Sequence, residues 1–371
     1  MPSKLRMNLF FELLRYSLGI TDKFDKKLSD QEWENIYQTA YNQAVVGLLF
    51  NGVKKLSGEY APPMMLVMRW AAQAENIRGM NQASNHRAKE LTDLFLKLGH
   101  NTLILKGQAN SRLYPDDGIR QTGDIDIYIE GGKEKVLKML TDNHLINSED
   151  FVAYHHVELA DESGGIVVEA HFRPSGGVHN YFGNKHLQQF LNNNTNNVYH
   201  TEEGFNAPSM QFALAMQLAH VQHHFIESGV GLRQVTDYYY LLKSSSKEER
   251  DCVASMLKAF RLEHFASALM WVLQYIFLLD EEYMLCKPNP EKGDVVFKAI
   301  TEGGNFGYLN GFSKDNFAKR FIKRRIRLAK QFITFPRDIM WEILSYTKYV
   351  LGTIPWRIRN RRLTVDGKRH D

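Results

Sequence analysis

Apolar residues recur at intervals of three and four along the first hundred residues, as in "WENIYQTAYNQAVVGLLFNGVKKL" (33–56). This spacing predicts amphipathic helices, because side chains three and four positions apart share one face of a helix. Pro62 and Pro63 interrupt the pattern, and a second long helical segment (64–99) then runs up to the first strand candidate. We therefore expect an N-terminal helical region over residues 1–84.

The pattern changes between residues 85 and 200, where short apolar runs alternate with polar turns. Strands are predicted at 102–105, 124–129, about 154–159 and 166–172, with one helix opened by Gly107 and another over 133–143. A turn at Asp161, Gly164 and Gly165 separates the last two strands. This middle part is predicted to be a small domain of strands and helices.

Helical periodicity returns after the polar stretch "LNNNTNNVYHTEEGFN" (191–206), which we interpret as a domain boundary. Ser209 follows Pro208 and is predicted to cap a helix that runs toward Phe225. We expect a C-terminal helical domain over 201–318 and a basic helical tail over 319–371. The predicted fold class is α+β, with a small mixed sheet flanked by N- and C-terminal helical regions.

Composition narrows the class of protein. Only Cys252 and Cys286 are present, so neither a disulfide framework nor a cysteine zinc site is expected, and a reducing cytoplasm fits. The first twenty residues contain charged side chains, whereas the core of a signal peptide is continuously apolar. The uncharged and strongly apolar run over 265–279 is shorter than the roughly 20 residues that cross a bilayer, so it predicts a buried helix and no transmembrane segment.

The candidate chemistry centres on "GDIDI" (123–127). Side chains alternate along a strand, so Asp124 and Asp126 point to the same side while Ile125 and Ile127 point into a core. Two carboxylates this close repel unless a cation lies between them, and hard oxygen ligands suit Mg²⁺ or Mn²⁺. Glu169 lies in the middle of a later apolar strand, where it could complete the acidic cluster, and His171 shares its face.

A phosphate site is predicted just upstream. Lys106 and Gly107 end a strand before a helix, and free backbone N–H groups at a helix N-terminus attract phosphate. Phosphate binding beside three carboxylates is what two-metal phosphoryl or nucleotidyl transfer requires, with cations about 3.5–4 Å apart.

These motifs resemble a known group. "LKG" (105–107), "LYP" (113–115), "GDIDI" and "VEAHFR" (168–173) are similar, in order and spacing, to an uncharacterised bacterial nucleotidyltransferase family of the polymerase-β-type nucleotidyltransferase superfamily. The resemblance covers roughly residues 85–245. It implies a minimal nucleotidyltransferase domain that binds a nucleoside triphosphate and transfers its nucleoside monophosphate to an acceptor hydroxyl, with release of pyrophosphate.

The resemblance also implies roles for single residues. Asp124, Asp126 and Glu169 would bind the metal ions, and Gly107 would contact the triphosphate. The broader superfamily has Ser or Gly directly after the strand-end glycine, whereas this chain has Gln108; Ser111, one turn further on, could supply the hydroxyl instead.

Several other side chains have two interpretations each. Lys106 and Arg120 could bind the triphosphate, although Lys106 could be a solvated strand end and Arg120 a salt-bridge partner of the aspartates. The resemblance places Arg233 and Asp237 on a helix that would face the cleft, with Arg233 toward phosphate and Asp237 toward the acceptor. His171, beside Glu169, is also expected on the acceptor side. At i, i+4, Arg233 and Asp237 could equally form a surface pair.

A histidine cluster, "HVQHHF" (220–225), places His220 and His224 at i, i+4, a spacing that zinc sites use. No Glu or Cys stands near in the usual arrangement, so we interpret His220 and His223 as residues packed beside the cleft.

The tail from Lys319 onward carries 15 Lys and Arg against 4 Asp and Glu, interleaved with aromatic residues. This composition is typical of a solvated helix face, and it also fits an RNA backbone or an anionic membrane surface. The acceptor could be a small molecule, a protein or RNA. A phosphotransferase on the same scaffold and a catalytically silent nucleotide- or RNA-binding module remain as alternatives.

Overall fold

The computed structural model describes residues 3–147, 149–160, 165–304 and 317–360. Part of the turn predicted at Asp161 and Gly164, and the last residues of the tail, lie outside these ranges. The N-terminal helices are α1 (Ser3–Ser17), α2 (Asp30–Asn42), α3 (Val46–Val53) and α4 (Met64–Lys97). The predicted helical region is therefore confirmed.

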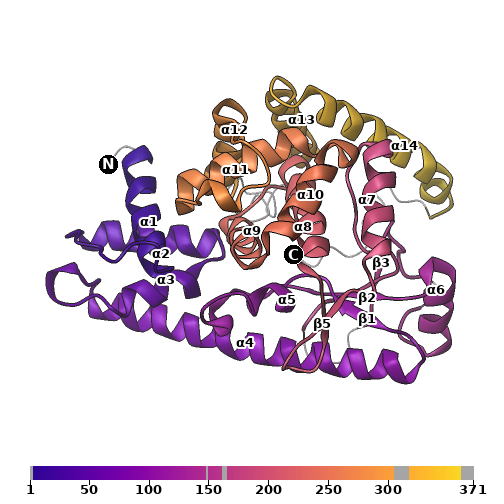
Figure 1. Ribbon diagram of the computed structural model, residues 1–371, viewed down its shortest axis with the longest axis horizontal. Helices are drawn as coiled ribbons and strands as arrows, with labels where there is room; N and C mark the ends of the chain where they lie inside the picture. Colours follow the sequence, from indigo (N-terminus) through magenta and orange to yellow (C-terminus); the bar gives the residue numbers. More distant parts are fainter. Residues whose placement is uncertain (1–2, 148, 161–164, 305–316, 361–371) are drawn as a thin grey trace.

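Helix α4 runs along the base of the molecule, from the other N-terminal helices to the sheet (Figure 1). At one end Trp70 packs against Tyr37, and its indole N–H donates to the Val46 carbonyl at 2.9 Å. At the other end Leu91 and Phe95 pack beneath the sheet. The predicted boundary at residue 84 falls within this continuous helix and stays a prediction.

The main sheet has four strands in the order β1-β2-β4-β3. Strand β2 pairs antiparallel with β1 and parallel with β4, and β3 pairs antiparallel with β4, so the sheet is mixed as predicted. The strands are β1 (Thr102–Ile104), β2 (Ile125–Ile129), β3 (His156–Glu158) and β4 (Val168–His171). All four strands lie where the sequence predicts them, and β3 and β4 are shorter than predicted.

The two faces of this sheet belong to two hydrophobic cores. Ile125, Ile127 and Ile129 of β2 pack with α4 and with α6 (Gly132–Asp142), the helix predicted over 133–143. Tyr128, on the opposite face, joins the larger core beneath the C-terminal helices. The period of two along β2 thus puts Asp126 on the face that looks toward those helices.

Two local predictions were incomplete. The helix opened by Gly107 is α5 (Gln108–Ser111), a single turn. The polar stretch at 191–206 contains a hairpin of β5 (Val198–His200) and β6 (Asn206–Pro208), in which the Asn206 amide donates to the Thr102 carbonyl of β1 at 3.2 Å. This hairpin was not predicted, because strands of three residues are too short to show a clear alternation.

The C-terminal helices stand over the sheet (Figure 1). Ser209 is the N-cap of α8 as predicted, although its hydroxyl makes no capping hydrogen bond. Helix α1 joins the same core through Arg15, which donates to the Ile276 carbonyl at 2.8 Å. The helices are α7 (Tyr181–Asn193), α8 (Met210–Glu227), α9 (Leu232–Ser244), α10 (Lys247–Phe260), α11 (Glu263–Phe277) and α12 (Pro290–Gly303).

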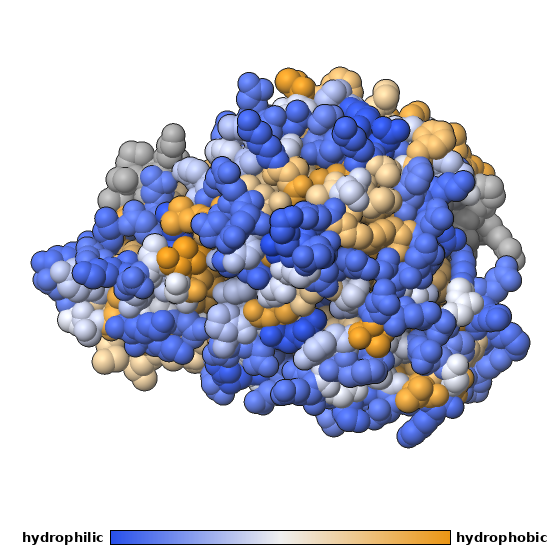
Figure 2. Space-filling model, viewed as in Figure 1, coloured by the Kyte–Doolittle hydropathy of each residue, from blue (hydrophilic) through white to orange (hydrophobic). Residues whose placement is uncertain are grey.

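The described part of the basic tail forms two helices, α13 (Phe317–Phe332) and α14 (Pro336–Asn360). Apolar side chains such as Leu344, Leu351 and Ile358 are exposed on α14. Figure 2 shows hydrophobic residues at the surface among hydrophilic ones over the C-terminal helices, in the upper part of the view. Among the described residues, no helix combines the length and the apolar character that crossing a bilayer requires.

Candidate functional site

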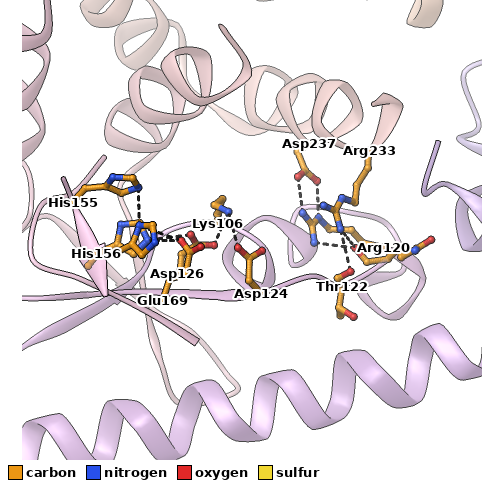
Figure 3. A network of polar contacts seen from close by, with 12 residues as sticks. Lys106, Arg120, Thr122, Asp124, Asp126, His155, His156, Glu169, Arg233 and Asp237 are labelled. Carbon is orange, nitrogen blue, oxygen red and sulfur yellow. Dashed lines mark hydrogen bonds and ion pairs between the residues drawn. The ribbon is translucent and has the colours of Figure 1, made fainter. Parts of the chain in front are cut away.

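The three predicted carboxylates meet on one face of the sheet. Asp124 directly precedes β2, Asp126 lies within it, and Glu169 is the register partner of Asp126 on β4. Partners on neighbouring parallel strands point to the same face, which brings these side chains together. One ligand oxygen from each lies within 4.8 Å of the others. Figure 3 shows the three carboxylates side by side.

Lys106 holds a positive charge between the two aspartates. Its Nζ lies 2.7 Å from Asp126 Oδ2 and 3.7 Å from Asp124 Oδ2. Burial lowers the pKa of Lys106, but the carboxylates of Asp124, Asp126 and Glu169 more than offset it and raise that pKa above its ordinary value. Lys106 is therefore not a solvated strand end: in this structure its ammonium partly neutralises the cluster.

His171 adds a second positive charge. Its Nε2 lies 3.1 Å from Asp126 Oδ1 and 3.2 Å from Glu169 Oε2. Burial opposes the protonated form, but the hydrogen bonds with the two carboxylates raise the pKa of His171 to about 9. The two carboxylates thus favour the protonated form of His171, which belongs to the acidic cluster on the same side of β4 as Glu169.

Two further histidines beside the cluster were not among the predicted site residues. His156 is the register partner of His171 on β3, and its Nδ1 lies 3.6 Å from Glu169 Oε2 and 3.0 Å from His155 Nε2. Burial lowers the pKa of both His155 and His156. The signal was present in "YHHVE" (154–158), where consecutive histidines open a predicted strand, but only the pairing of β3 with β4 brings them to Glu169.

Gly107 has φ +63°, in the left-handed region that favours glycine, and a side chain built on it would approach the Asp124 carbonyl at 3.7 Å. The chain therefore turns sharply beside the acidic cluster. A one-turn α5 gives little of the helix-end field that was predicted there. The Ser111 hydroxyl donates to the Gln108 carbonyl at 2.8 Å, a bond it would have to give up to reach a phosphate.

Arg120 does not pair with Asp124 or Asp126. Its guanidinium makes a bidentate ion pair with Asp237, with Nε and Nη2 each 2.7 Å from a carboxylate oxygen. The Tyr114 hydroxyl donates to the same carboxylate at 2.6 Å, and all three side chains are buried. Helix α9 is buried along nearly its whole length, so the surface pair considered for Arg233 and Asp237 is wrong.

Arg233 holds the backbone that leads to the aspartates. Its Nη1 donates to the carbonyls of Gln121 at 3.2 Å and Thr122 at 3.0 Å. From the other side, the Asn81 amide of α4 donates to the carbonyls of Gly118 at 2.9 Å and Arg120 at 2.7 Å. The segment before β2 is therefore fixed from both sides, which sets the position of Asp124 (Figure 3).

A pocket opens between this face of the sheet and helices α8 and α9. The sheet side contributes Lys106, Gly107, Arg120, Gly123, Asp124 and Asp126, and the helices contribute Gln217, His220, Arg233, Gln234 and Asp237. His220 lies beside the cleft as predicted, and its ring contacts that of His224 with centroids 4.4 Å apart. These two histidines do not belong to any of the possible metal-binding groups found among the described residues.

The acidic cluster has the right chemistry for a hard cation. Three carboxylates converge, and one of them, Asp126, is only 1% exposed. Carboxylate oxygens are the donors that Mg²⁺ and Mn²⁺ prefer. The present counter-charges, one ammonium and one imidazolium, leave this group of residues with one negative charge in excess. The donor set therefore fits a divalent cation.

The comparisons with known proteins agree with this chemistry. None of the curated proteins searched matches the sequence. A family described as "uncharacterised nucleotidyltransferase" matches residues 29–277, a longer stretch than the one that carries the motif resemblance. It includes all three carboxylates, the histidines of β3 and β4, and helix α9. Because this match covers most of the chain, the protein belongs to this family of uncharacterised nucleotidyltransferases.

Proposed function

We propose that the protein is a metal-dependent nucleotidyltransferase that transfers a nucleoside monophosphate from a nucleoside triphosphate to an acceptor hydroxyl. The observation that carries this proposal is the convergence of Asp124, Asp126 and Glu169, two of which, Asp124 and Asp126, line a pocket that also presents cationic side chains. Membership of the nucleotidyltransferase family supports the reaction class.

Asp124, Asp126 and Glu169 would hold Mg²⁺ or Mn²⁺. When bound, such cations offset the negative charge on the phosphates and on the attacking and leaving oxygens. Loading the site requires Lys106 to leave its position between the aspartates. The Lys106 ammonium would then lie against the phosphates of the incoming triphosphate. Substrate binding would therefore be coupled to the loss of the Lys106 ion pair.

The arginines act first as positioning residues in this proposal. Arg120 keeps Asp237 and Tyr114 in place, and Arg233 holds the loop ahead of Asp124. Both line the pocket together with Asp237, which balances the charge of Arg120, so a phosphate that enters there would be attracted by Arg233. Close approach of the phosphates past the backbone is possible at Gly107, which has no side chain.

The acceptor would enter near Glu169, His156 and His171. In the metal-free site the carboxylates of Asp126 and Glu169 raise the pKa of His171, whereas burial lowers the pKa of His156 and favours its neutral form. We therefore assign His156 as the group that accepts the hydroxyl proton, with Glu169 stabilising the resulting imidazolium. The acceptor oxygen then forms a bond to the α-phosphorus, the bond between the α-phosphorus and its bridging oxygen breaks, and pyrophosphate leaves with its electron pair.

The test combines binding and label transfer. Calorimetry with each of the four ribonucleoside triphosphates, with and without Mg²⁺, should show Mg²⁺-dependent binding that an Asp124→Asn/Asp126→Asn variant loses. Asp142→Asn, which removes an exposed carboxylate on α6, serves as the control and should bind normally. The preferred triphosphate, labelled at the α- or the γ-phosphate, is then incubated with the protein and a cell extract.

Nucleotidyl transfer requires that the α-label reaches an acceptor and the γ-label leaves as pyrophosphate. Transfer of the γ-label instead would identify a phosphotransferase. Binding that ignores both Mg²⁺ and the two substitutions would remove the main support for the proposal.

A further inference from the structure

A second group of metal-ligating side chains lies outside the acidic cluster. It consists of His179, His223 and Glu227, which we call the His179 cluster. His179 lies in the loop between β4 and α7, next to the helix N-cap at Asn180, whereas His223 and Glu227 are one turn apart near the end of α8. The cluster therefore connects the loop that follows β4 to the C-terminal helices.

Donor atoms of all three residues converge. His223 Nε2 lies 3.2 Å from Glu227 Oε2, and His179 Nε2 lies 3.6 Å from Glu227 Oε1. One ligand atom from each lies within 4.8 Å of the others. The two imidazole rings stack, with centroids 5.1 Å apart and planes inclined by 15°. Two imidazole nitrogens and one carboxylate thus face a common point.

One of these donors lacks a hydrogen bond. The side chain of His179 is only 10% exposed, and its buried Nε2 has no hydrogen-bond partner in the described structure. An unsatisfied buried nitrogen costs free energy unless something else fills its lone pair or takes its proton. This atom points toward the Glu227 carboxylate, where a bound cation would satisfy it.

Charges around the cluster are compatible with a cation. Burial lowers the pKa of His179 to about 4 and favours the neutral form that binds metals, whereas Glu227 outweighs burial and raises the pKa of His223, so a bound metal has to displace a proton from His223. Two arginines lie near Glu227. Arg324 is paired with Glu342, with Nη2 2.5 Å from Oε1, and Arg327 Nη2 donates to the Ile226 carbonyl at 3.1 Å. Their charges weaken cation binding but leave the carboxylate of Glu227 available.

We propose that His179, His223 and Glu227 bind a zinc ion and leave a further coordination position open. Two imidazoles and one carboxylate form a donor set that suits Zn²⁺, whereas the oxygen-only cluster at Asp124 suits Mg²⁺. Three protein ligands with an open position are typical of zinc sites that bind water or substrate. The His220 and His224 pair considered from the sequence is not this site.

The proposed zinc site lies near the pocket. His223 follows His220 by three residues on α8, so the two share one side of that helix, and His220 lines the pocket. The open position would therefore lie near the pocket. A ligand there is expected to be an anionic or hydroxyl-bearing group, because these are what zinc binds in place of water.

The test uses metal-stripped full-length protein titrated with Zn²⁺ by calorimetry and with Co²⁺ by visible absorption. Wild type should bind one Zn²⁺ tightly, and Co²⁺ should give the intense absorption of a site with few ligands. Glu227→Gln and His179→Ala should each weaken Zn²⁺ binding by about 100-fold or more, since even loss of an outer partner costs about 10–100-fold.

Three control variants locate the ion. His186→Ala removes an exposed histidine on α7 and should leave binding unchanged. His156→Ala and Asp126→Asn, which alter the neighbouring clusters, should also keep the tight site. Circular dichroism checks that each variant is folded. Loss of tight binding in His156→Ala but not in His179→Ala, equal binding in all variants, or no tight binding in wild type would overturn the proposal.

Discussion

Two regions beside the same pocket pair carboxylates with cations in different proportions. In the acidic cluster, three carboxylates share Lys106 and His171. In the network on α9, one carboxylate, Asp237, receives a bidentate pair from Arg120 and a hydrogen bond from Tyr114. The first region has negative charge in excess and the second has none.

This difference separates a site that needs a cation from one that is already complete. A matched buried ion pair holds its parts in fixed positions, and removing one partner leaves a buried charge without compensation. Carboxylates in excess repel one another, and binding of a divalent cation lowers the free energy of such a group. We therefore expect the acidic cluster to govern activity and the Arg120–Asp237 pair to govern stability.

The largest expected effect is on catalysis. Asp124→Asn should lower the rate of nucleotidyl transfer by about 1000-fold or more, because metal ions supply several kcal/mol of transition-state stabilisation. The side chain is 34% exposed and belongs to a repelling group, so the free energy of unfolding should fall by less than about 1 kcal/mol. Pyrophosphate release and urea denaturation measure the two quantities. A large loss of stability with normal activity would reverse the comparison.

The second effect is on stability. Asp237→Asn should lower the free energy of unfolding by about 3 kcal/mol, because it leaves the buried Arg120 guanidinium without its counter-charge. Asp142→Asn, at the exposed pair with Lys138, is the control and should cost less than about 1 kcal/mol. Chemical denaturation compares both variants with wild type. Equal effects would mean that the Arg120–Asp237 pair contributes no more than a surface pair.

The third effect is a pH dependence of the acidic cluster in metal-free protein. The folded-state pKa of His171 is raised to about 9, so its contribution is full below the ordinary pKa of 6.5 and is lost as pH rises through 9. Between these values stability should fall by about 3 kcal/mol in the presence of a chelator. The Arg120–Asp237 pair adds no such slope, since arginine stays charged. His171→Gln should flatten the profile, and an unchanged slope in this variant would refute the assignment.

The smallest effect is expected where the two regions meet. A side chain at Gly123 would meet Arg233 Nη1 at 3.3 Å, which requires a shift of a few tenths of an ångström. Gly123→Ala should therefore cost less than about 1 kcal/mol of stability, while moving Arg233 and the adjoining Asp124 enough to raise the KM for the triphosphate. Steady-state kinetics and denaturation separate these effects. Gly79→Ala, at an open helical position, is the matched control.

Much of the fold could be predicted because its signals are local. Period-two alternation identified β2 and placed Asp124 and Asp126 on one side, and helical spacing identified the N- and C-terminal helices. The hairpin β5–β6 was missed because strands of three residues carry almost no such signal. The length of α5 was left open, since a glycine can open a helix but does not fix its length.

For the site, the sequence determined which side chains are available, and the tertiary structure decided which of them meet. Asp124, Asp126 and Glu169 could be named in advance, because carboxylates within apolar strands stand out. The residues that contact them could not be named in advance. That Arg120 pairs with Asp237, that His156 reaches Glu169, and that His179 meets His223 all depend on contacts between elements far apart in the chain, which no local pattern encodes.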